Sequence, residues 1–92
     1  MSPAERAYIV TLYRDAIARR RRSRTTMAKA EIDAYSRAIC ECARWHDSRD
    51  LAAALEQLAA KADSDESNPD RRQGLSNAYV SAASMARNAR TV

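Results

Sequence analysis

Apolar residues recur every three or four positions along most of this chain, which is the period of an amphipathic α-helix. The pattern predicts four helices, over about residues 3–22, 27–46, 49–62 and 69–89. Ser2 and Pro3 form a helix-start signal before the first, and Asn68 and Pro69 repeat it before the last. The polar, acidic stretch DSDESN predicts a loop over residues 63–68.

The residues available for a core are mostly small. The chain has no Phe, one Trp and five Leu, whereas about twenty of its 92 residues are Ala. One Gly and two Pro leave almost no helix breakers, so the composition favours helix nearly throughout. We therefore predict a single all-α domain over residues 1–92, a small four-helix bundle or a related helical array. The alternative is a pair of helical hairpins completed by a second copy of the chain.

Three features bear on how these helices pack. The predicted core face of the second helix consists of Ala28, Ile32, Tyr35, Ile39, Cys42 or Ala43, and His46. Gly74 marks either a tight helix crossing or a frayed first turn of the last helix. Trp45 is expected in the core, with a partner-facing position as its alternative, and Tyr79 is expected there too.

The most distinctive stretch is ARRRRSR, residues 18–24. The net charge is +4 and the isoelectric point is about 9.5, and the positive charge is segregated: the six residues 19–24 carry five arginines, whereas residues 47–66 are net acidic. Arg20 and Arg24 continue the core-facing line of Tyr13 and Ile17. Because a buried, unpaired guanidinium is very costly, we expect the packed part of the molecule to end at about Arg19.

This run predicts a cationic helix end that grips phosphates or carboxylates, since the planar guanidinium binds either by paired hydrogen bonds. The alternative is a solvated helix end that only complements the helix dipole. The predicted contact residues are Arg19, Arg20, Arg21, Arg22 and Arg24, with secondary basic contacts from Arg71, Arg72, Arg87 and Arg90.

Other chemistry has little support in the sequence. Cys42 and His46 have ligand-compatible spacing, but the chain has one further Cys and no further His, so no metal site is expected. No glycine-rich phosphate loop and no convergent carboxylate pair occur, so we expect neither enzyme activity nor a cofactor. Cys40 and Cys42 lie too far apart around a helix to pair, and no apolar run or signal peptide appears. A cytoplasmic protein without a membrane segment is therefore predicted.

These observations favour a non-enzymatic helical binding protein that docks on a protein or nucleoprotein partner through its arginine-rich helix end. Two alternatives stay open. One is an accessory protein, either monomeric or dimeric, that binds DNA or RNA without sequence preference. The other is a structural helical oligomer without a ligand. In size, helicity and lack of catalytic motifs the chain resembles the short accessory proteins of phages and other mobile elements, anti-CRISPR inhibitors among them. That resemblance rests on no motif and assigns no residue; it implies a nucleoprotein complex as one kind of partner.

Overall fold

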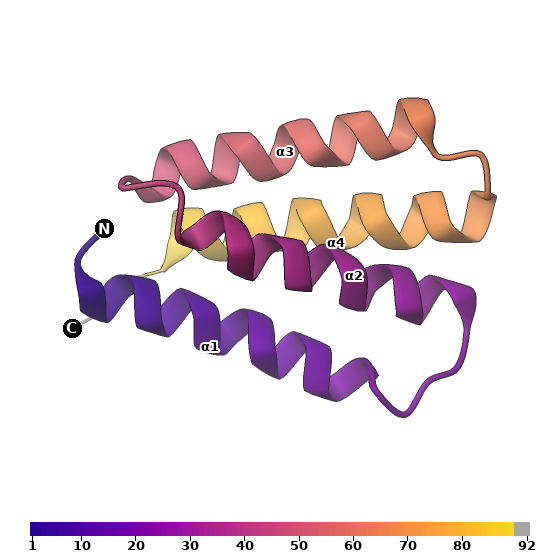
Figure 1. The fold of residues 1–92 in the computed structure, drawn as a ribbon, viewed down its shortest axis with the longest axis horizontal. Helices are drawn as coiled ribbons and strands as arrows, with labels where there is room; N and C mark the ends of the chain where they lie inside the picture. The colour runs from indigo at the N-terminus through magenta and orange to yellow at the C-terminus, as the bar shows by residue number, and fades with distance from the viewer. Residues whose placement is uncertain (90–92) are drawn as a thin grey trace.

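The computed structural model describes residues 1–89 and contains four helices in that range. They are α1 (Pro3–Arg20), α2 (Thr26–Cys42), α3 (Ser48–Asp65) and α4 (Pro69–Asn88). Successive helices run antiparallel and lie lengthwise beside one another (Figure 1). The predicted small all-α bundle is therefore confirmed. Within residues 1–89, none of the helices combines the length and the apolar character needed to cross a bilayer.

The helices form an open array in which α4 is central. Helices α2 and α3 both pack along α4 and hardly touch each other, while α1 packs mainly on α2 (Figure 1). The α1–α2 and α3–α4 loops lie at one end of the array, and the α2–α3 turn lies at the other. A hollow of about 350 Å³ lies between α2 and α3.

Each helix begins with a side-chain cap. The capping oxygens belong to Ser2, Thr25, Asp47 and Asn68. They accept hydrogen bonds from backbone N–H groups, with nitrogen–oxygen distances of 2.6 to 3.1 Å. These caps satisfy donors that the first turn of a helix leaves without partners. Because the capping residues are local signals, the predicted starts lie within one residue of the observed ones.

The predicted end of the second helix is wrong. Helix α2 ends at Cys42, and residues 43–47 form a turn instead of the predicted last helical turn. The carbonyl of Trp45 accepts a hydrogen bond from Arg6 Nη2 of α1 (3.2 Å), and the carbonyl of His46 accepts one from the N-terminal amine of Met1. His46 is exposed in this turn and is not part of the core face.

The predicted acidic loop over residues 63–68 is also too long. Helix α3 continues to Asp65, so half of that stretch is helical and only Glu66 to Asn68 connects it to α4. Acidic and hydroxyl side chains on an exposed face do not break a helix, and Ser64 Oγ donates to the carbonyl of Ala60 at 3.1 Å. The helix stops where Asn68 and Pro69 begin the next one.

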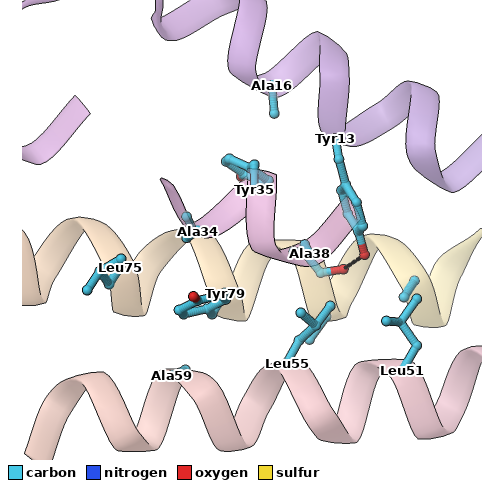
Figure 2. Packing of buried hydrophobic residues seen from close by; sticks show 14 of the residues in the cluster. Tyr13, Ala16, Ala34, Tyr35, Ala38, Leu51, Leu55, Ala59, Leu75 and Tyr79 are labelled. Carbon is cyan, nitrogen blue, oxygen red and sulfur yellow. Dashed lines mark hydrogen bonds between the residues drawn. The ribbon is translucent and has the colours of Figure 1, made fainter. Parts of the chain in front are cut away.

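Alanine lets the helices approach closely around a few large side chains (Figure 2). Leu51 and Leu55 of α3 are fully buried, as is Tyr13 of α1. The Tyr13 hydroxyl donates to the carbonyl of Ala82 in α4 at 2.7 Å, which ties α1 to the central helix. Gly74 sits at the α2–α4 crossing, where a Cβ in place of its hydrogen would lie 2.5 Å from the carbonyl oxygen of Met27. Of the two interpretations of Gly74, the tight crossing is therefore the correct one.

The core face of α2 is rotated from the predicted one. Ala30, Ala34 and Ala38 are fully buried, whereas Ile32 and Ile39 are only partly buried. The central helix crosses α2 on its alanine side, because small side chains allow the closer approach. The larger isoleucines flank that contact.

Candidate functional site

The arginine run begins in the last turn of α1 and continues through the loop to α2. Helix α1 ends at Arg20, with Arg21 as its C-cap in a helical conformation. Thr25 then caps α2, and its hydroxyl lies 3.3 Å from that of Ser23. The run therefore spans a helix end and a loop, and its side chains leave the backbone in different directions.

Arg20 differs from its neighbours because it is paired within the molecule. Its Nε lies 2.9 Å from Glu31 Oε2 on α2, and Nη1 donates to the carbonyl of Ala16 at 2.8 Å. The guanidinium carbon lies 5.0 Å from the ring centre of Tyr35, within cation–π range. The packed part ends at Arg20, one residue beyond the expected Arg19, because Glu31 compensates the charge of a half-buried Arg20. We therefore remove Arg20 from the predicted contact surface.

The other four arginines of the run are exposed. Arg19 Nε donates to the backbone carbonyl of Asp15 at 3.4 Å. Within residues 1–89, none of Arg19, Arg21, Arg22 and Arg24 has a carboxylate within ion-pair distance. We call these four residues the arginine end.

An apolar hollow adjoins the arginine end. It has a volume of about 370 Å³ between α1 and α2 and is lined by Arg14, Ile17, Ala18, Arg21 and Ile39. Arg14 and Arg21 lie seven residues apart on one side of α1, so both guanidinium groups flank the same apolar patch. Cationic and apolar groups are thus combined at this end of the molecule.

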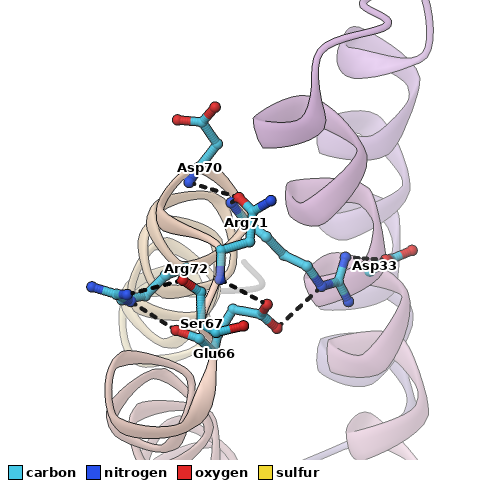
Figure 3. A network of polar contacts seen from close by, with 7 residues as sticks. Asp33, Glu66, Ser67, Asp70, Arg71 and Arg72 are labelled. Atoms are coloured by element: carbon cyan, nitrogen blue, oxygen red, sulfur yellow. Dashed lines mark hydrogen bonds and ion pairs between the residues drawn. The ribbon is translucent and has the colours of Figure 1, made fainter.

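Two of the predicted secondary contacts instead join α4 to the rest of the fold (Figure 3). Arg71 bridges α2 and the α3–α4 loop, with Nη1 at 3.0 Å from Asp33 and Nε at 3.3 Å from Glu66. The hydrogen bond to Asp33 is the main reason that the pKa of Arg71 is raised. Arg72 donates to the carbonyl groups of Glu66 and Ser67. Arg71 and Arg72 both donate hydrogen bonds to groups of their own chain, so we also remove them from the predicted set of partner-contacting arginines.

The remaining two secondary candidates do not add to the arginine end. Arg87 pairs with Glu56 of α3, and this hydrogen bond raises the pKa of Arg87 and lowers that of Glu56. Arg90 lies outside the described residues.

Sequence reasoning missed a second charged cluster, at the C-terminal end of α2. Glu41 is only 3% exposed, and it is the one buried charged residue among residues 1–89. Its Oε1 accepts from Arg37 Nε at 3.0 Å and from Arg44 Nη1 at 3.3 Å, and its Oε2 accepts from the indole of Trp45 at 3.0 Å. The spacing i−4, i+3 and i+4 around Glu41 was a signal for this cluster in the sequence.

The cluster keeps Glu41 ionised. Burial acts to raise the pKa of this carboxyl, but hydrogen bonds from Trp45 and Arg37 and the charges of Arg44 and Arg37 outweigh it, so the pKa falls below its ordinary value. Only one side of the cluster is closed by protein. The other faces a hollow of about 350 Å³ between α2 and α3.

The thiol of Cys42 is part of the hydrophobic core. It is buried in the core, and this burial raises its pKa to about 11, although the charge of Arg6 acts in the opposite direction. A thiol with so high a pKa is almost entirely protonated near neutral pH and is a poor nucleophile. Cys42 and His46, whose spacing is compatible with metal binding, lie in different surroundings: Cys42 is in the core and His46 is exposed.

Comparisons with protein-family models, with curated proteins and with solved structures found no match to this chain.

Proposed function

We propose that this protein is a non-enzymatic binding module that docks on an acidic protein surface through the arginine end. The supporting observation is that four exposed guanidinium groups lie there without a carboxylate partner in residues 1–89, although acidic residues pair with arginines elsewhere in the fold. Each unpaired guanidinium can donate two parallel hydrogen bonds to one carboxylate of a partner. An acidic patch on a nucleoprotein complex would satisfy the same chemistry.

The adjoining hollow favours protein over bare nucleic acid as the partner. Ile17 and Ile39 offer apolar surface between Arg14 and Arg21, and an acidic protein segment can supply an apolar anchor beside its carboxylates. A phosphate backbone has no such anchor, and no aromatic residue occurs in the run on which bases could stack. Sequence-independent nucleic-acid binding is the alternative outcome of the test.

A reducing, cytoplasmic setting is part of the proposal. Cys40 and Cys42 are both free thiols, as is usual for proteins of such compartments.

The test compares two variants that remove equal charge. Arg21→Gln/Arg22→Gln removes two groups of the arginine end, and Arg49→Gln/Arg87→Gln removes two exposed arginines elsewhere. Tagged proteins are used to capture partners from the native host, with and without nuclease, and the partners are identified by mass spectrometry. We expect a nuclease-resistant partner that the first variant loses and the second retains.

Three results would count against this function. Equal capture by both variants would remove the arginine end from binding. Loss of all partners on nuclease treatment, together with duplex or single-strand affinity that falls steeply with salt, would favour the nucleic-acid alternative. A stable homo-oligomer that captures no partner would favour the structural alternative.

A further inference from the structure

The groove between α2 and α3 is distinct from the arginine end. Two hollows, of about 350 and 260 Å³, lie along it. The first lies between α2 and α3 and the second between α3 and α4, and both are lined by Leu58 and Lys61 of α3, so they adjoin as one groove along α3. It exists because α2 and α3 each pack on α4 but hardly on each other.

Apolar side chains line the groove along its length, and the more accessible of them lie in the first hollow. Trp45 and Ala54 line the first hollow, Leu75 and Tyr79 line the second, and Leu58 lies between them. Leu58 and Trp45 are only partly buried, and their remaining surface faces the groove. The lining of α3 extends from Ala54 to Asp65, about 17 Å at 1.5 Å per residue. That length matches three turns of a helix.

The two ends of the groove carry opposite charge. At the end near the α2–α3 turn, Arg37 and Arg44 hold the single carboxylate of Glu41, and Lys61 lies farther along α3, where the two hollows meet. At the end near the α3–α4 loop, the lining acids are Asp65 and Glu66. Glu66 pairs with Arg71, whereas Asp65 is exposed.

Glu41 also fixes the geometry of the basic end. One carboxylate holds Arg37 and Arg44 by Oε1 and the indole of Trp45 by Oε2. Both guanidinium groups keep further N–H donors, because each uses one nitrogen on Glu41. The basic end is therefore organised before any partner arrives, which lowers the entropic cost of binding.

We propose that this groove binds an amphipathic helix of a partner protein, with acidic side chains over Arg37, Arg44 and Lys61 and basic side chains over Asp65. An apolar stripe on that helix lies on Trp45 and Leu58, the partly buried apolar side chains of the groove, in the helix-in-groove mode of recognition. The opposite charges of the two ends give the bound helix one orientation. This site does not depend on the arginine end, so either proposal can fail without the other.

The position of Trp45 makes the test direct, because it is the only tryptophan of the chain. The probe is a synthetic helical peptide of about 14 residues, or four turns, with a leucine stripe, Glu in one half and Lys in the other. Comparison peptides carry Lys in both halves, or Ser in place of Leu. We expect saturable changes in Trp45 emission with the first peptide, and binding at least about tenfold weaker for each comparison peptide, since charge repulsion or loss of apolar contact opposes it.

Matched variants of the full chain locate the binding. Lys61→Glu reverses an exposed charge in the groove, and Arg49→Glu makes the same charge change about 18 Å along α3 and 120° around it. We expect Lys61→Glu to weaken binding about tenfold and Arg49→Glu to leave it unchanged, with far-UV circular dichroism showing that both fold.

Several results would overturn this proposal. They are equal binding by the Glu/Lys and all-Lys peptides, equal effects of the two variants, or full competition by inorganic phosphate, which would mark a site for a small anion. A change in Trp45 emission with protein concentration alone, in step with dimer formation by sedimentation, would show that a second copy fills the groove instead.

Discussion

Replacing Gly74 by Ala should destabilise the protein, although the same change in most helices stabilises. In an exposed helix interior, Gly→Ala is favourable by about 1 kcal/mol. Here the new methyl carbon would lie 2.5 Å from the carbonyl oxygen of Met27 and 2.9 Å from Cβ of Ala30. Both atoms belong to α2, and neither is the flexible end of a side chain. The two helices must therefore move apart.

The expected loss of stability is the difference between the cost of overpacking and the gain in helix propensity. Overpacking of a well-packed core costs about 1–3 kcal/mol, and two close contacts, one of them to backbone, place this site near the upper value. After the helix-propensity gain is subtracted, we expect a net loss of about 1–2 kcal/mol. For a domain of this size, that lowers the midpoint of thermal unfolding by about 5–15 °C.

Urea unfolding, followed by Trp45 emission and by far-UV circular dichroism, measures this difference. The control is Ala53→Gly on the exposed face of α3, which should cost about 1 kcal/mol through propensity alone. If Gly74→Ala instead raised stability by about 1 kcal/mol, the close α2–α4 crossing would be refuted.

Three further predictions concern single side chains. Arg20→Ala should lower the free energy of unfolding in urea by about 1–2 kcal/mol, because the ion pair with Glu31 and the cation–π contact are both lost. Arg22→Ala should change it by less than about 0.5 kcal/mol. Equal costs would contradict the conclusion that Arg20 is paired within the fold and Arg22 is not. The Glu41 carboxylate, with its lowered pKa, should stabilise the fold above the unfolded-state pKa of about 4.3, and this contribution should be lost as pH falls through the lower folded-state pKa. Glu41→Gln should therefore flatten the dependence of the urea midpoint on pH below about pH 5, and an unchanged profile would exclude this role. Tyr13→Phe should cost about 1 kcal/mol in thermal unfolding through its lost buried hydrogen bond, and no loss would mean that this bond contributes nothing net.

Helix starts could be predicted from the sequence because their signals are local. Ser2 with Pro3 and Asn68 with Pro69 each fix a start within three residues of sequence. Helix ends depend on distant partners. Helix α2 stops early where Arg6, some forty positions away, meets the carbonyl of Trp45, and no local pattern contains that contact.

The candidate site was predictable to the same extent. Periodicity placed Arg20 on the core-facing line of α1, and it does lie there, half-buried. Its partner Glu31 could not be identified, since that requires the register between α1 and α2. The groove was beyond sequence reasoning because it depends on which helix is central. Its basic end could have been noticed from the spacing of Arg37, Glu41 and Trp45.

The core face of α2 shows why side-chain size misleads in an alanine-rich chain. Ile32 and Ile39 dominate the hydrophobic pattern, yet the helix packs on Ala30, Ala34 and Ala38. Close backbone approach to α4 gains more van der Waals contact than burial of the larger side chains at a wider spacing. The isoleucines are left partly buried beside that contact, and Ile39 lines the hollow beside the arginine end.

The availability of the arginine end can be tested most directly by NMR of arginine Nε–Hε groups during titration with an oligo-glutamate peptide. A duplex DNA of equal charge serves as the comparison ligand. We predict saturable shifts for Arg19, Arg21, Arg22 and Arg24 with the peptide, and little change for Arg20 and Arg71, which already hold carboxylates. Equal shifts across all six arginines, or a response confined to the duplex, would contradict a free, carboxylate-binding arginine end.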